Sequence, residues 1–513
     1  MTDSKRDSSK TPSGDAGSAS QRTDRPPLVP YCMAEYTPSS DPMYTGNPFI
    51  DALPAIRPDS GWTAQLLRNP TADSRDRELD GYLRSYKVVG VKRLLIPTAR
   101  HIQLARRFDQ IIRWGYEGRN PLQPERMVSL QETYARAQQS GKASKIVFSD
   151  SQSICTFGLI GCSGTGKSTT AEAIVASFPQ CIYHERYGIT QVVWLKVDCP
   201  KDGGVGDLAL SILRALDKVL KTTHAIDCER KKLNASRLAV KVNHLANAHH
   251  VGVLILDEMQ NLSVKKSCGR EEMLNWFQEL VNDIKLPIIL LGTYKMKSLL
   301  PWDLRHARRT GVLGSITWDP LTRGQEFDFL LENIWRYCVL RDAGELTEEL
   351  RQVIYDETQG IRAFMVDMFV IAQLHALVKG MEIITPELFR TAARTEFASV
   401  QPMIKALRNK DHKRIKTFAD LTSYNMDVEI ERLQHLTEVH ASKAPVVSSP
   451  SMMGVACESV VSFLDISDME ARQLILSVTT GSEKTSAALA KAAIKRYFEM
   501  KSGPADTPDG EAA

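Results

Sequence analysis

The chain has 513 residues and a formal net charge of +4, with 43% hydrophobic and 25% charged residues. This length is too great for one hydrophobic core, so we expect roughly two to four structural units of ordinary globular composition. The near-neutral charge excludes a basic field over the whole surface, and no apolar run reaches the ~20 residues that cross a membrane, so no membrane partner is expected.

The first 150 residues divide into a polar leader and a more apolar segment. Residues 1–30 are rich in Ser, Thr, Gly, Pro and charged residues and are predicted to be a disordered leader. Residues 31–150 are predicted to form a mainly helical N-terminal domain that docks on the rest of the chain and on a partner. Its features are an apolar hook between prolines at 47–54 (NPFIDALP) and an amphipathic helical pattern after residue 98.

Residues 154–170 (ICTFGLIGCSGTGKSTT) join an apolar, β-prone run to a helical pattern through the signature G-x-x-x-x-G-K-[ST]. This P-loop pattern predicts backbone N–H groups that cradle phosphate at a helix N-terminus. Lys167 is predicted to reach the β- and γ-phosphates of ATP, and Ser168 to ligate Mg²⁺. The residues assigned to nucleotide binding here are Gly161, Cys162, Ser163, Gly164, Thr165, Gly166, Lys167, Ser168 and Thr169.

Strand and helix patterns alternate over residues 151–320. We predict strands at 191–197, 253–257, 288–293 and 312–318, with helices between them. Such alternation is typical of a parallel sheet between helical layers, so the predicted class of this core is α/β.

Polar side chains end two of these predicted strands. Asp257 and Glu258 follow a buried run, and ligands of parallel sheets bind at this carboxyl edge. Asp257 is therefore predicted to hold Mg²⁺, and Glu258 to polarise the attacking water. Thr293 ends the next strand, where its hydroxyl either senses the γ-phosphate or makes a turn.

A cluster of arginines precedes the last strand, in the segment 303–311 (DLRHARRTG). An arginine here cannot easily reach its own nucleotide but can reach that of a neighbouring subunit. Arg305, Arg308 and Arg309 are thus candidate arginine fingers, with Arg308 or Arg309 favoured because they lie nearer the helix end. The alternative is a favourable interaction with the helix dipole.

The chain after residue 320 has helical patterns only. Residues 321–400 are predicted to form a helical lid, 401–442 a helical extension, 443–455 a linker, and 456–513 a small helical region with a polar tail. Arg362 opens a lid helix, where it either touches the γ-phosphate in cis or belongs to a capping turn.

Basic and hydroxyl side chains in loops are candidates for contacts with duplex DNA. They are Lys201, Lys221, Thr222 and Thr223. Single cations on loops suit phosphate contacts that do not depend on base sequence. Ordinary surface lysines are the alternative.

Four segments in order resemble those of AAA+ ATPases: GCSGTGKST, VLILDEMQNL, LLGTYKMKSL and DLRHARRTG. With the hook and the segments WGYEGRNP, QVVWLKVDC and LANAHHVGVLILDE, residues 31–424 resemble TnsC and the broader TniB group. The resemblance implies an AAA+ core with a helical lid and mainly helical extensions at both ends.

The resemblance also implies a function and partners. TnsC-type proteins bind ATP and Mg²⁺ between subunits and form rings or short filaments, of roughly six or seven subunits here, around duplex DNA. They connect a target-selection protein of TnsD or TniQ type to transposase subunits of TnsA or TnsB type, and hydrolysis resets them. Lys201 and residues 221–223 fall near the DNA-facing loops of that family. We expect a bacterial cytoplasmic protein associated with the nucleoid.

Two other functions stay open on the sequence alone. The core motifs also fit a replication initiator or helicase loader. A pull-down with this protein that recovers helicase and no transposase would favour that function. A largely non-hydrolytic scaffold organised by ATP is the other, and negligible turnover would support it.

Overall fold

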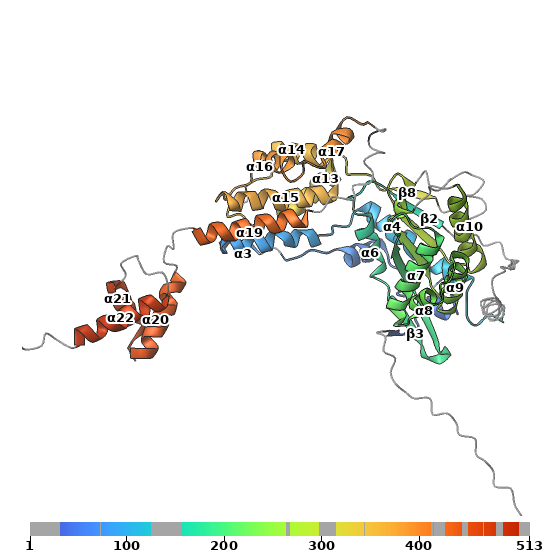
Figure 1. Ribbon diagram of the computed structural model, residues 1–513, viewed down its shortest axis with the longest axis horizontal. Coiled ribbons are helices and arrows are strands. Elements are labelled where there is room, and N and C mark those ends of the chain that lie inside the picture. The colour runs from blue at the N-terminus through green and yellow to red at the C-terminus, as the bar shows by residue number, and fades with distance from the viewer. Residues whose placement is uncertain are drawn as a thin grey trace, which may run out of the picture.

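The computed structural model describes residues 31–39, 41–71, 73–124, 156–262, 267–296, 314–342, 344–411, 414, 426–443, 450–464, 466–478 and 486–501. Figure 1 shows an α/β core, a helical lid beside it and a helical bundle at the C-terminal end. The arginine cluster at 303–311 lies outside the described residues.

A five-stranded parallel sheet forms the centre of the α/β core. Its strands, in spatial order, are β5 (Trp194–Asp198), β6 (Val253–Asp257), β7 (Ile288–Gly292), β2 (Thr156–Ile160) and β8 (Ser315–Thr317). All residues of β6 and β7 are buried, as expected for a parallel sheet covered on both faces. The predicted α/β class is confirmed, and the carboxyl ends of these strands meet at one edge.

Helices cover both faces of this sheet, and alternate residues of each strand point to opposite faces. Leu254 and Leu256 of β6 belong to a core with α7 (Val205–Leu220), α9 (Ala235–Ala248) and α10 (Ser267–Asp283). Val253 and Ile255 belong to a second core with α4 (Ala99–Glu117) and α6 (Lys167–Val175). The fold thus brings the N-terminal helix α4 and the P-loop helix α6 to the same face.

The strand predicted at 191–197 is interrupted in the structure. β4 (Ile189–Val192) pairs antiparallel with β3 (Cys181–His184) in a separate small sheet that also contains β1 (Cys32–Met33). The chain joins the main sheet only from Trp194. One continuous apolar run supplies both β4 and β5. The pattern of apolar residues therefore does not indicate where the chain passes from the small sheet to the main sheet.

The apolar hook packs against the end of α4 and the edge of the core. Asn47 caps α1 (Pro48–Asp51) through its side chain, and its Nδ2 donates to the carbonyl of Tyr116 at 2.8 Å. Phe49 is fully buried against the rings of Tyr116 and His250. Arg119, also buried, donates to the carbonyls of residues 251 and 252 at 2.7 and 3.2 Å. These contacts give the hook and the WGYEGRNP segment their structural role.

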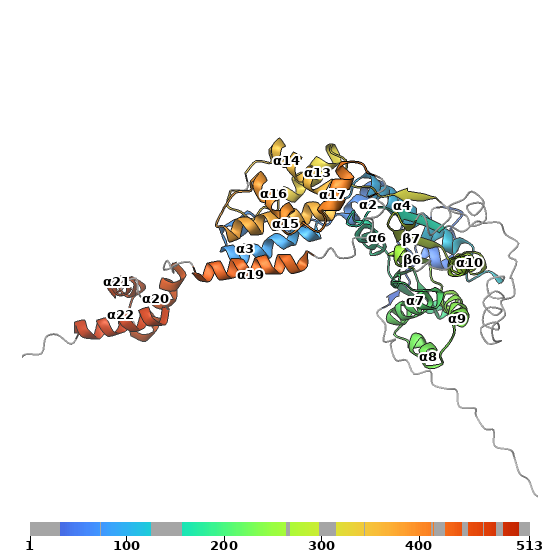
Figure 2. The same cartoon turned by 45° about the horizontal axis from the view of Figure 1, so that its top comes forward.

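The lid is a helical layer with its own hydrophobic core. Its helices are α13 (Gln325–Trp335), α14 (Glu348–Thr358), α15 (Arg362–Val378), α16 (Pro386–Arg394) and α17 (Gln401–Arg408). Two helices from distant parts of the chain, α3 (Gly81–Val88) and α19 (Asp427–Lys443), lie side by side and pack against α15 (Figures 1 and 2). Helical patterns alone did not predict this pairing.

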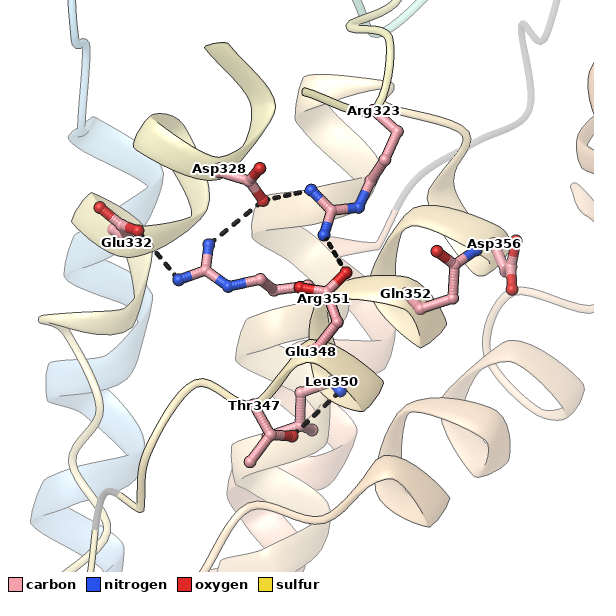
Figure 3. Close-up of polar contacts among 9 residues, drawn as sticks. All are labelled: Arg323, Asp328, Glu332, Thr347, Glu348, Leu350, Arg351, Gln352 and Asp356. Atoms are coloured by element: carbon pink, nitrogen blue, oxygen red, sulfur yellow. Dashed lines mark hydrogen bonds and ion pairs between the residues drawn. The ribbon is translucent and has the colours of Figure 1, made fainter. Parts of the chain in front are cut away.

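An ion-pair network joins α13 to α14 on the lid (Figure 3). Arg323 pairs with Asp328 and with Glu348, the latter at 2.6 Å. Arg351 pairs with Asp328 at 3.2 Å and with Glu332 at 2.9 Å. Asp328 is shared by the two arginines, so the pairs form one network between the two helices.

The remaining elements are short or C-terminal. α20 (Pro450–Leu464), α21 (Asp468–Val478) and α22 (Ser486–Lys501) form a small bundle with its own core. The others are α2 (Asp59–Leu66), η1 (Ser74–Glu78), η2 (Val89–Arg93), η3 (Glu185–Tyr187), α8 (His224–Arg230) and η4 (Met259–Asn261). Among the described helices, none has the length and apolar content needed to cross a membrane.

Candidate active site

The P-loop connects β2 to α6 with the backbone that its glycines permit. Gly164 and Gly166 have φ of 78° and 91°, a region that other residues rarely adopt. Gly166 is the N-cap of α6, so the first N–H groups of that helix face the loop. Lys167 Nζ donates to the carbonyls of Gly161 and Cys162 at 2.9 and 2.7 Å. Burial lowers the pKa of this ammonium.

Trp318 supports the P-loop from the end of β8, a role that the sequence analysis missed. Its indole Nε1 donates to the carbonyl of Thr165 at 3.0 Å. A Cβ at position 161 would lie only 2.1 Å from the Trp318 carbonyl oxygen, so glycine is required there. Arg100 stacks over the indole at 4.8 Å and His101 meets it edge-on, so α4 is linked to the loop through one side chain.

The acidic residues lie at the carboxyl end of β6, as predicted. Asp257 is buried, and its carboxylate accepts from the backbone N–H of Glu258 at 2.8 Å. Lys196, on the neighbouring strand β5, lies 3.2 Å from the other oxygen of Asp257. The Asp257 charge is one of several that raise the pKa of Lys196 against the opposing effect of burial. This lysine was also missed, because its place beside Asp257 depends on strand register.

Glu258 and Thr293 are joined by a third side chain, that of Gln260. Glu258 has a left-handed backbone with φ 55°, and its Oε2 accepts from Gln260 Nε2. Gln260 Oε1 accepts from the backbone N–H of Thr293 at 3.0 Å. Desolvation, and then the neighbouring Asp257 carboxylate, raise the pKa of Glu258. A raised pKa makes this carboxylate a stronger proton acceptor than an ordinary glutamate.

The first turn of α15 contacts the P-loop directly. The backbone N–H of Ala363 donates to the Gly164 carbonyl at 3.0 Å, and a Cβ at 164 would lie 3.0 Å from Ile361. Arg362 donates to the Ile96 carbonyl at 3.3 Å, and its Nη1 lies 2.7 Å from Nε2 of His101. The lid is therefore hydrogen-bonded to both the loop and the N-terminal segment.

His101 is the partner of Arg362 in its neutral form. Burial, followed by the charges of Arg362 and Arg100, lowers the pKa of His101 to about 2. Because a guanidinium only donates, Nε2 of His101 accepts from Arg362, while Nδ1 lies 3.1 Å from the Thr98 backbone nitrogen and 2.8 Å from Thr98 Oγ1, as in a capping box. Among the residues that the structure describes, the buried Nε of Arg362 has no hydrogen-bond partner.

A cavity of about 320 Å³ unites these groups. The residues predicted for nucleotide binding or catalysis that line it are Ser163, Gly164, Gly166, Lys167, Ser168, Thr169, Asp257, Glu258, Thr293 and Arg362. The sequence analysis missed its apolar walls, formed by residues 94–96 before α4 and by Leu330 and Val366 of the lid. No local pattern marks these residues, because only the tertiary fold places them at the cavity.

The cavity fits a nucleotide with a divalent cation. Its volume is at the lower end of the ~300–1,000 Å³ typical of ligand sites. The N-terminus of α6 and Lys167 suit phosphate at one end, and the aliphatic walls suit a flat base. The Ser168 hydroxyl and the Asp257 carboxylate are oxygen ligands of the kind that Mg²⁺ takes.

The predicted DNA-contacting residues do not form one cluster. Lys201 is exposed in the loop between β5 and α7, and Lys221 is exposed at the far end of α7, ~24 Å away at 1.5 Å per residue. The Thr222 hydroxyl donates to Asp217 at 2.5 Å, and the Thr223 hydroxyl lies 3.5 Å from Asp227. Both hydroxyls take part in the turn that begins α8.

Part of the α/β core is similar to a known protein family. Residues 155–300, which contain the P-loop and the strands β6 and β7, match a family model described as AAA domain. This segment is similar to AAA domains. With the five-stranded sheet and the helical extensions, the AAA domain and its lid have an AAA+ P-loop fold. No curated protein sequence matches the chain.

Several solved structures are similar to this chain. Cdc6p from Pyrobaculum aerophilum is 16% identical, with 74% of this chain and 95% of that chain covered and a TM-score of 0.34. The Aeropyrum pernix ORC1 protein in complex with DNA is 14% identical, with 74% and 84% covered and a TM-score of 0.30. The Walker-type ATPase of Pyrococcus abyssi is 14% identical, with 73% and 91% covered and a TM-score of 0.33.

Proposed function

We propose that this protein binds ATP with Mg²⁺ in the cavity between its AAA domain and lid and hydrolyses it. One observation supports this above all: Lys167, Asp257, Glu258, Thr293 and Arg362 line a single cavity, although they come from separate elements. Phosphate-binding, metal-binding, basic and donor groups are the set that phosphoryl transfer to water needs.

Each side chain has a distinct task in this proposal. Lys167 and the P-loop amides bind the phosphates, while Ser168 and Asp257 hold Mg²⁺. The bound ion neutralises negative charge on the phosphates. Glu258 orients the attacking water and accepts its proton. Arg362 shares its guanidinium between the cavity and His101, so that lid position responds to the nucleotide.

We extend the proposal to assembly on DNA, on the strength of the TnsC-like segments. In this extension ATP lies between subunits of a ring or short filament around duplex DNA, and Arg305, Arg308 or Arg309 serves the neighbour's site. The assembly connects a target-selection protein of TnsD or TniQ type to a TnsA- or TnsB-type transposase in the bacterial nucleoid. Hydrolysis then releases it, which makes the protein a regulator of transposition.

The first test uses the wild-type protein. We expect phosphate release from ATP, and we expect a non-hydrolysable ATP analogue with duplex DNA to give rings or filaments in electron micrographs. A protein that stays monomeric with saturating ATP and DNA contradicts the assembly proposal. Negligible turnover contradicts the ATPase proposal and supports a scaffold, and capture of helicase without transposase supports a replication role.

The DNA proposal predicts a loss of phosphate contacts from two loop variants. Lys201→Ala and Lys221→Asn should each weaken duplex binding equally across sequences and reduce the slope of log affinity against log salt by ~1. Asparagine is chosen at 221 because the backbone there is left-handed, with φ 56°. Titration by fluorescence anisotropy at several salt concentrations measures both effects.

The control for these variants is Lys379→Ala, which removes an exposed lysine at the end of α15. It should keep the wild-type affinity and slope. Unchanged slopes for both loop variants would remove Lys201 and Lys221 from the DNA interface.

A further inference from the structure

The Gln260 amide joins the ends of two neighbouring strands. Gln260 lies in the single turn η4 that follows β6, and its two polar atoms face different partners. Its Nε2 donates to Oε2 of Glu258, while its Oε1 accepts from the backbone N–H of Thr293, the residue that follows β7. An amide group is planar, so these two contacts fix its orientation and fix each partner relative to the other.

The neighbouring residues leave room for this amide. A Cβ at position 292 would lie 3.0 Å from Gln260 Oε1 and 3.1 Å from Met296 Sδ, and glycine stands there. The backbone of η4 is held as well, because the N–H of Asn261 donates to the Glu258 carbonyl at 2.8 Å. A larger side chain at position 292 would therefore crowd the Gln260 amide.

We propose that Gln260 is a positioning residue for ATP hydrolysis, which holds the Glu258 carboxylate in register with Thr293 at the end of β7. This inference rests on the proposed ATPase function and goes beyond it, because the DEMQ segment contributes an amide as well as two acids. Gln260 does not act on the substrate. It removes the freedom of the Glu258 side chain, which otherwise turns toward solvent.

The physical need for such a restraint comes from the charges around Glu258. Asp257 is its immediate neighbour and repels its carboxylate, whereas Lys167 attracts it from across the cavity. Glu258 is also exposed on one side, so packing alone does not set its rotamer. A neutral donor on the same turn can hold one oxygen and leave the other for water.

A purely structural role for Gln260 makes different predictions. If the amide only satisfied the Thr293 N–H, its loss would lower stability and would affect nucleotide binding and turnover together. A positioning role lowers kcat and leaves ATP affinity near the wild-type value, because the P-loop contacts are untouched.

The experiment compares Gln260→Ala and Gln260→Glu with the matched control Gln401→Ala. In the lid, Gln401 Nε2 donates to Glu357 Oε2 at 3.3 Å, the same pair of groups away from the cavity. We expect kcat for ATP to fall ~10- to 100-fold in both Gln260 variants, with the Kd for an ATP analogue within ~3-fold of wild type. Gln260→Glu still accepts from Thr293, but it replaces the donor to Glu258 with a carboxylate that repels Glu258, so its kcat should be at least as low as that of Gln260→Ala.

A double-mutant cycle with Glu258→Gln completes the test under single-turnover conditions. If Gln260 acts through Glu258, then Gln260→Ala should change the rate less than ~3-fold in the Glu258→Gln background. A full additional loss there, or wild-type kcat in the single variants, overturns the positioning role while the ATPase proposal stands. Absence of hydrolysis by the wild-type protein overturns both.

Discussion

Lys167→Ala is expected to weaken binding of MgATP at least ~100-fold, because the charge-assisted hydrogen bonds of this ammonium contribute about 1.5–3 kcal/mol each. Lys167 starts α6 and its Nζ lies within 2.9 Å of two P-loop carbonyls, at the point where phosphate oxygens would approach. No other lysine of the P-loop segment could replace it. Isothermal titration with MgATP measures the loss, and ATP-dependent DNA binding should disappear with it.

The matched control for this prediction is again Lys379→Ala, which should bind MgATP as the wild type does. Thermal unfolding without nucleotide checks that Lys167→Ala keeps its fold, since Lys167 also ties the loop carbonyls together. A folded Lys167→Ala protein with wild-type affinity for MgATP would contradict the assigned site. One that still coated DNA as well as wild type would contradict ATP as the assembly switch.

The parts of the site that sequence could predict are those carried by short segments. The P-loop glycines, Asp257 and Thr293 each stand at a fixed place relative to a strand end. Because parallel strands present their carboxyl ends at one edge, the strand patterns alone indicate that these residues converge. Their common cavity in the structure agrees with that argument, while their individual roles stay predictions.

The parts that sequence could not predict depend on contacts between distant segments. Ile96 and Leu330 line the cavity from distant segments of the chain, and nothing in either local pattern relates them. Trp318 supports the P-loop only because β8 lies beside β2. Lys196 faces Asp257 through the register of β5 with β6, in which residue 198 is opposite residue 257.

The lid shows the same limit on a larger scale. Its helices were predicted from their apolar periods, but α3 and α19 join them from segments that the sequence analysis assigned to other parts of the chain. Lys92, just after α3, pairs with Asp367 of α15 at 3.2 Å and with Asp427 of α19 at 2.7 Å. Since Lys92 also lines the nucleotide cavity, these two helices are physically connected to the site.

Glu258→Gln is expected to lower kcat for ATP by ~10²- to 10³-fold while ATP affinity stays within ~3-fold of wild type, because a positioned general base contributes about that much to rate. The substituted amide keeps the size of the side chain and can still accept from Gln260, so the loss isolates the proton-accepting oxygen. Phosphate release measures turnover, and binding of a fluorescent ATP analogue measures affinity.

The structure offers a close control in Glu357→Gln. Glu357, like Glu258, accepts a hydrogen bond from a glutamine amide, but it lies in the lid at α14. That variant should hydrolyse ATP at the wild-type rate. Because Glu258→Gln retains ATP, it should also remain assembled on duplex DNA long after the wild type has dissociated, as sedimentation or electron microscopy would show. Rapid turnover by Glu258→Gln would remove Glu258 from the role of base, and fast dissociation without turnover would separate hydrolysis from disassembly.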